Sequence, residues 1–182
     1  MGDEQKKQLE QQLWNIANEL RGKMDADEFR DYILGFIFYK YLSGKMLAYA
    51  NDLLKEDGVT YLALDENSDE GKEYLAAISE ESLNKLGYFL EPSKLFSQVA
   101  KRGKESDTLI IEELSEILND IANSTMGTES EDDFEHLFED LDLASTKLGR
   151  TVEARNTLIS KVLTHLDAID FDLQNQERDV LG

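Results

Sequence analysis

The sequence predicts an all-α domain with a bundle-like arrangement of helices, and three observations support that fold class. Apolar residues recur at helical spacing along most of the chain. Capping residues stand at the ends of these periodic segments, as they do at helix termini. One run is hydrophobic almost all round, which marks a central helix covered by others. With 182 residues, 41% of them hydrophobic, the chain can bury one sizeable core, enough for one domain or one domain plus a small lobe.

The first two helices have the clearest signals. An apolar stripe along residues 9–20 ends just before Gly22, a candidate C-terminal cap. Asp25 then precedes Glu28 by three residues, a pattern close to a capping box, ahead of the apolar run at residues 32–42. An aromatic run could also stack nucleic-acid bases, but no strand pattern or interleaved arginine accompanies this one. We therefore expect the run to form the buried central helix.

The middle of the chain alternates short helices with loops. Residues 55–58 predict a turn, and residues 59–64 and 88–90 could pair as one small two-stranded β-ribbon. Residues 72–86 between them predict one or two short helices, with Ser79 as a candidate N-cap.

Three further helices are expected in the C-terminal half. Pro92, the only proline, is well placed to open a helix that ends near Lys101. Asp107 could cap the next helix, and the last begins near Thr151, with a polar loop at residues 123–133 between the two. The expected buried stripes of these two helices are Leu109, Ile110, Leu114, Ile117, Leu118 and Ile121, and Val152, Leu158, Ile159, Val162, Leu163 and Leu166.

Charge is distributed unevenly along the chain. The formal net charge is −20, from 39 acidic and 19 basic residues, and such a surface repels DNA phosphates at long range. Residues 105–143 carry 14 acidic side chains and no lysine or arginine. Residues 82–104 carry five basic and one acidic side chain, and residues 145–165 carry four and one. The acidic segment is interpreted as a solvated surface, with two basic stretches on either side of it.

Several kinds of site chemistry are excluded by what the chain lacks. There is no cysteine, so disulfides, cysteine-ligated zinc and thiol catalysis are impossible. The closest of the eleven glycines, Gly35 and Gly44, are too far apart for a Walker loop or a G-x-G cofactor turn. A single proline excludes an Asn-Pro-Pro-aromatic motif, and His136 and His165 belong to no metal-ligand pattern. No catalytic, cofactor-binding or metal-binding residue is therefore predicted.

The sequence also predicts where the protein works. Its polar start offers no apolar signal-peptide core. The apolar run at residues 32–42 falls well short of the roughly 20 residues that a membrane span needs. We expect a cytoplasmic protein without a membrane partner, and the absence of cysteine suits a reducing compartment.

Blocks spread over nearly the whole chain carry a resemblance to a known family. The most specific are residues 13–22, LWNIANELRG, and residues 27–43, DEFRDYILGFIFYKYLS. Further blocks are residues 87–92, GYFLEP, residues 145–149, STKLG, and residues 178–182, RDVLG. Together they resemble the opening of the modification (M) subunits of type I restriction–modification systems.

The resemblance implies a helical N-terminal domain at residues 1–170, followed at residues 171–182 by the start of a linker into a methyltransferase domain that this chain lacks. The parent protein would be a site-specific adenine-N6 DNA methyltransferase that uses S-adenosylmethionine. This chain, without the cofactor and catalytic motifs, is expected to bind no cofactor and to be inactive. The implied partners are a specificity subunit, a second modification subunit, a restriction subunit and DNA within the complex.

The resemblance further implies that this domain helps to close the complex around DNA and to assemble its subunits. The candidate phosphate contacts come from the two basic stretches, although each is also compatible with an ordinary surface charge. They are Lys101, Arg102, Lys104, Lys147, Arg150 and Arg155, with Arg21 and Lys23 in the first interhelical turn as alternatives.

Two other function classes remain open from the residues alone. An acidic DNA mimic that inhibits restriction enzymes would suit the net charge of −20. Such a mimic should spread its acid along the whole length, whereas this chain has two basic stretches. A free-standing helical interaction module, whose aromatic core is purely structural, is the third possibility.

Overall fold

The fold is all-α, as the helical periodicity predicts. The computed structural model describes residues 3–105, 108–124, 138 and 141–169, and none of these residues forms a β-strand. The α-helices are α1 (Asp3–Leu20), α2 (Ala26–Leu54), α3 (Asp69–Lys85), α4 (Phe96–Lys104), α5 (Ile111–Ser124) and α7 (Val152–Asp167). Single 3₁₀ turns, η1 (Lys55–Asp57), η2 (Tyr61–Ala63) and η3 (Pro92–Lys94), stand between them.

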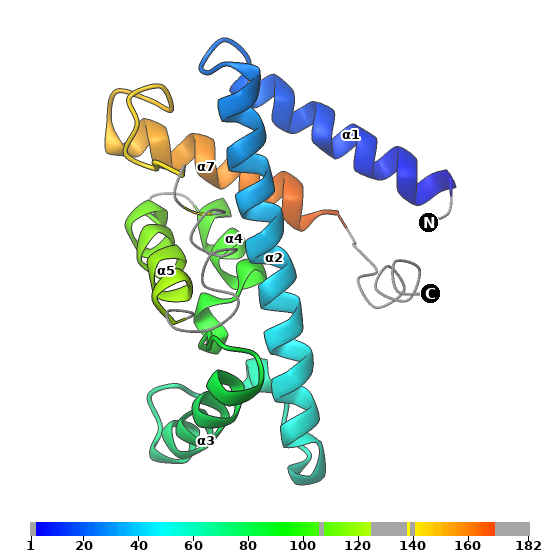
Figure 1. Cartoon of the computed structure of the whole chain (residues 1–182), viewed down its shortest axis with the longest axis vertical. Helices are drawn as coiled ribbons and strands as arrows, with labels where there is room; N and C mark the ends of the chain where they lie inside the picture. Colours follow the sequence, from blue (N-terminus) through cyan, green and yellow to red (C-terminus); the bar gives the residue numbers. More distant parts are fainter. Residues whose placement is uncertain (1–2, 106–107, 125–137, 139–140, 170–182) are drawn as a thin grey trace.

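Helix α2 is the long axis around which the other helices are arranged. It runs the length of the molecule, with α3 beside its C-terminal end and α4, α5 and α7 grouped along the other part (Figure 1). Helix α7 crosses behind α2 and contacts α1, α4 and α5 as well. Phe36, Tyr39 and Met46 of α2 are fully buried, which confirms the expected central helix, although Leu34 is about half exposed.

The helix caps predicted at the start of the chain are confirmed. The Asp25 carboxylate accepts a hydrogen bond from the Glu28 amide at 2.9 Å. Gly22 has a φ of 80°, a left-handed conformation that favours glycine after a helix. In the middle of the chain the expectation needs correction, because α3 is one helix capped by Ser68, and Ser79 lies inside it.

The β-ribbon expected from residues 59–64 and 88–90 is absent from the described structure. The first segment contains η2 and the second has no regular secondary structure. Their backbone groups find side-chain partners instead: Asn51 Oδ1 accepts from the Tyr61 amide at 2.7 Å, and the Tyr61 hydroxyl donates to the Leu90 carbonyl. The aromatic residues in these segments do not belong to paired strands; the side chains of Tyr61 and Tyr88 are buried in the helical core instead.

Two apolar residues expected in buried stripes are exposed. Leu109, which precedes α5, is 55% exposed, and Val152 is 43% exposed in the first turn of α7. The other members of both stripes are buried, and Thr151 caps α7 as expected. The proposed Asp107 cap, most of the loop at residues 123–133 and the boundary at residues 170–171 lie outside the described residues.

Asn156 joins α7 to the start of α5. Its Oδ1 atom accepts hydrogen bonds from the amides of Ile110, at 2.7 Å, and Ile111, at 3.1 Å. Its Nδ2 atom donates to the Thr108 carbonyl at 3.0 Å. The first amides of a helix have no partner within the helix, so this side chain acts as a cap supplied from a distant part of the chain.

Replacing this cap should destabilise the domain more than changing its neighbour. Asn156→Ala leaves two buried amides and one carbonyl without their partner, which we expect to lower the free energy of unfolding by about 2–4 kcal/mol. Thr157→Ala is the matched control, because Thr157 is exposed and adjacent on α7. Urea unfolding measures both variants, and equal stabilities would contradict the capping role.

Four tyrosine hydroxyls donate to backbone carbonyls from buried or partly buried positions. Tyr32 donates to Asp142, Tyr39 to Lys94, Tyr61 to Leu90 and Tyr88 to Leu42. Burial, followed by the nearby negative charges of Asp142 and Glu28, raises the pKa of Tyr32 to about 12. Burial likewise raises the pKa values of Tyr39, Tyr61 and Tyr88.

Alkaline pH should therefore unfold the domain. A tyrosine whose pKa is higher in the folded than in the unfolded chain stabilises the folded state. For Tyr32 this stabilisation is complete at pH values below 10.0, the ordinary pKa of tyrosine, and it is lost as the pH rises to about 12. Unfolding free energies measured against pH, together with phenolate absorbance, test this. The prediction would be contradicted if the buried tyrosines formed phenolates while the circular dichroism of the chain stayed helical.

Candidate nucleic-acid interface

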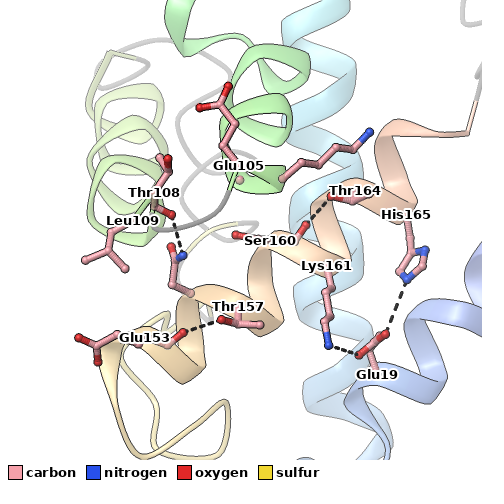
Figure 2. A pocket seen from close by; sticks show the side chains of 13 residues that line it. Glu19, Glu105, Thr108, Leu109, Glu153, Thr157, Ser160, Lys161, Thr164 and His165 are labelled. Atoms are coloured by element: carbon pink, nitrogen blue, oxygen red, sulfur yellow. Dashed lines mark hydrogen bonds and ion pairs between the residues drawn. The ribbon is translucent and has the colours of Figure 1, made fainter.

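The two basic stretches of the sequence meet because α4 packs along α7. Gly103 permits the close approach: a Cβ atom there would lie 3.0 Å from Ser160 Oγ, closer than nearly all real contacts. Figure 2 shows the end of α4, at Glu105, beside the middle of α7. The two basic stretches, some 50 positions apart in the chain, are thus brought side by side by the packing of α4 on α7.

The last turn of α4 carries three of the candidate cations. Lys101 and Lys104 are exposed, and their spacing of three residues puts them on neighbouring parts of the helix surface. The Arg102 guanidinium instead donates to the Glu113 carboxylate of α5 at 2.6 Å. Cations in a last turn are also favoured by the helix dipole, so this group has a structural role in any case.

The remaining three candidates belong to the loop before α7 and to its first turns. Lys147 forms an ion pair with Glu28 at the start of α2, and this hydrogen bond raises the pKa of the lysine. Arg155 Nη1 donates to the Gly149 carbonyl at 3.0 Å, which holds the loop against the helix. Arg150 is exposed.

The structure therefore divides the six candidates into two sets. The charged groups of Arg102, Lys147 and Arg155 are engaged with other parts of the domain. The side chains of Lys101, Lys104 and Arg150 have no hydrogen bond or ion pair within the described residues. Sequence reasoning could not make this division, because the partners Glu28 and Glu113 come from distant segments.

The alternative pair, Arg21 and Lys23, flanks Gly22 in the turn between α1 and α2 and is exposed. It belongs to neither basic stretch and lies on a different element from α4 and α7.

A pocket of about 600 Å³ lies where α1, α4 and α7 meet. Its charges are mixed: Lys104 lines it, together with Glu105 and Glu153 (Figure 2). Ser160 Oγ is the one buried side-chain polar atom without a partner in the described part of the chain, but it is covered and out of reach of solvent. The pocket accordingly offers no grouping of nucleophile, base and oxyanion donor for catalysis.

His165 is part of the seam between α1 and α7. Its Nδ1 atom lies 3.2 Å from Gln12 Oε1, and its Nε2 atom lies 3.9 Å from the Glu19 carboxylate (Figure 2). Lys161 reaches the same carboxylate at 3.9 Å. These contacts indicate an interhelical role. Among the described residues no three histidine, aspartate or glutamate side chains are placed to hold a metal ion.

None of the described helices is both long enough and apolar enough to cross a membrane. Among the described residues, the large apolar side chains with the greatest exposure are Trp14, at 61%, and Leu109, at 55%.

Known proteins resemble this chain in both sequence and structure. A methylase subunit of the type I restriction enzyme MpnII, from Mycoplasma pneumoniae, is 31% identical over 173 residues, which cover 93% of this chain and 32% of the relative. A crystal structure of the methyltransferase subunit of a type I restriction–modification system, from Streptococcus thermophilus, superposes with a TM-score of 0.66 and 32% identity. That match covers 88% of this chain and 33% of the other.

The chain spans about a third of the length of these relatives. A family model described as the HsdM N-terminal domain matches residues 9–166, most of the 182-residue chain. The all-helical fold, the sequence blocks and these matches agree, and the chain belongs to the family of HsdM N-terminal domains.

Proposed function

We propose that this domain contacts the DNA backbone and helps to assemble a type I methyltransferase complex. The observation that carries the DNA part is a set of exposed cations, Lys101, Lys104 and Arg150, that have no hydrogen bond or ion pair among the described residues. The two lysines belong to α4, which packs along α7, and Arg150 belongs to the loop that precedes α7. Phosphate contacts of this kind position a protein on DNA without reading its sequence.

The net charge determines when such contacts form. At −20 the isolated domain repels DNA at long range and binds it poorly. Once partner subunits hold the domain against DNA, contacts over a few ångströms dominate, because salt screens charges beyond about 8 Å. The three cations then act at short range while the more distant carboxylates contribute little.

The proposed partners are a specificity subunit, a second modification subunit and a restriction subunit, in addition to DNA. This proposal is supported by two relatives that are methylase or methyltransferase subunits of type I systems. The proposed location is the cytoplasm, where such a complex meets DNA.

The chemistry is proposed to belong to the parent subunit, as adenine-specific methyl transfer from S-adenosylmethionine. This chain contributes no glycine-rich turn for the cofactor and no catalytic motif. Its family membership weighs against a DNA mimic, and the two basic stretches do so independently.

The DNA contacts can be tested by neutralising the unpartnered cations in the complete complex. Replacing Lys101, Lys104 and Arg150 together by alanine should weaken DNA binding evenly across sequences. It should also reduce the slope of log affinity against log salt by roughly 3, one counterion for each lost phosphate contact. Titrations of DNA at several salt concentrations measure both quantities.

A matched control removes the same charge elsewhere. Lys55, Lys72 and Lys85 are exposed on η1 and α3, away from α4 and α7, and their triple alanine variant should leave the salt slope unchanged. Equal effects of the two triple variants would mean that only the net charge of the domain matters. If the variant of Lys101, Lys104 and Arg150 bound DNA with unchanged affinity and salt slope, the proposed phosphate contacts would be refuted.

The proposal that the cofactor site lies outside this domain can be tested separately. Isothermal titration calorimetry of the 182-residue chain with S-adenosylmethionine should show no binding, because no close pair of glycines can form the cofactor turn. The full-length subunit is the positive control. Binding by the 182-residue chain at the affinity of the full-length subunit would place the cofactor site in this domain and refute the proposal.

A further inference from the structure

The ion pair between Lys147 and Glu28 is the most open of the contacts that engage the candidate cations. The Lys147 side chain is 55% exposed, whereas that of Arg102, which joins α4 to α5 through Glu113, is 30% exposed. An exposed lysine–carboxylate pair contributes little to stability. The lysine ammonium is also a point charge on a flexible stem, so it can change partners more easily than a guanidinium held in a fixed orientation.

The loop that carries Lys147 has other contacts that keep it in place. Leu148 is fully buried, and the Tyr32 hydroxyl of α2 donates to the Asp142 carbonyl at the start of the loop. On the other side, the Arg155 guanidinium of α7 donates to a loop carbonyl at 3.0 Å. These contacts hold the main chain of the loop between α2 and α7. The lysine side chain can therefore leave its partner without the loop moving.

The carboxylates that act on Lys147 stand at the start of α2. Asp25 caps this helix, and Glu28 lies in its first turn. The N-terminus of a helix carries a partial positive charge, which stabilises carboxylates placed there. Asp25 is exposed and the Glu28 side chain is 34% exposed, so water can solvate both. Departure of the ammonium therefore leaves neither carboxylate buried without a partner.

Lys147 shares its loop with Arg150, one of the cations proposed to contact DNA. The two residues are three positions apart, so their Cα atoms lie at most about 11 Å from each other. DNA held at Arg150 would thus bring its phosphates close to Lys147. A phosphate competes with a carboxylate for an ammonium group, and the contact is favoured because it releases a counterion from the DNA.

We propose that Glu28 pairs with Lys147 in the free domain and that a DNA phosphate displaces it in the assembled complex. The inference rests on the proposed function, because it needs DNA at Arg150. The exchange adds a fourth phosphate contact to the three exposed cations. It also makes that contact conditional, since the ammonium changes partner only when a phosphate is held beside it.

A double-mutant cycle of Glu28→Gln and Lys147→Ala in the complete complex tests the exchange. Glu28→Gln should raise the affinity for DNA about two- to fivefold, because an exposed ion pair no longer has to be broken. Lys147→Ala should reduce the slope of log affinity against log salt by roughly 1, the loss of one phosphate contact. In the Lys147→Ala background, Glu28→Gln should lose most of its effect, because no ammonium remains to be released.

Glu80→Gln is the control for net charge, because Glu80 is exposed on α3, beside the opposite end of α2 (Figure 1). It should change the affinity for DNA equally with and without Lys147, and by less than Glu28→Gln does in the unaltered background. Equal effects of Glu28→Gln with and without Lys147 would overturn the proposal. An unchanged salt slope in Lys147→Ala would also overturn it, and the ion pair would then only join the loop to α2.

The triple alanine variant of the three exposed cations separates a failure of this inference from a failure of the proposed function. If the triple variant weakens DNA binding but Lys147→Ala leaves the salt slope unchanged, the exchange at Lys147 is refuted and the DNA role stands. If neither variant changes DNA binding, both the exchange and the proposed DNA role are refuted.

Discussion

The arrangement of the helices depends on a lysine ammonium group placed at a helix end. Lys40, in the middle of α2, donates to the carbonyls of Leu166, at 2.7 Å, Asp167, at 3.3 Å, and Ile169. The last carbonyls of a helix have no partner within it and carry the negative end of its dipole, so a cation there satisfies both. The same ammonium lies 5.8 Å from the Phe96 ring centroid at the start of α4. One charge thereby ties the two helices of the candidate interface to the central axis.

Other polar side chains connect the elements in the same way. Ser43 of α2 accepts from the Phe96 amide at 2.9 Å, and Asn156 of α7 accepts from the first amides of α5. The end of α7 and the starts of α4 and α5 are thus satisfied by side chains from other helices, so these three ends cannot shift independently. This rigidity matters for a domain whose proposed task is to hold a few cations against a phosphate backbone. Because the net charge of −20 repels DNA, the proposed contacts would form only in the assembled complex.

Local signals predicted the parts of the fold that depend on neighbouring residues. Gly22, Asp25 and Thr151 cap their helices as expected, since a cap acts over three or four positions. The ribbon was wrong because Tyr61 and Tyr88 alternate like strand residues, while their hydroxyls bond the distant Leu90 and Leu42 carbonyls. For the same reason the sequence could list the basic residues but not separate Lys101 from Arg102. Only the fold places Glu113 beside the arginine.

The role of Lys40 is tested most directly by Lys40→Met, which keeps the aliphatic stem and removes the ammonium donor. The variant should lose about 2–4 kcal/mol of unfolding free energy, because partly buried carbonyls at the end of α7 lose a charged hydrogen-bond partner. Lys45→Met makes the same substitution on α2 at an exposed position, where Nζ lies 5.2 Å from the Tyr41 ring, and should cost much less. Denaturant unfolding measures both, with hydrogen exchange at residues 164–169 locating the loss. Equal stabilities of the two variants, with the end of α7 protected in both, would contradict the account.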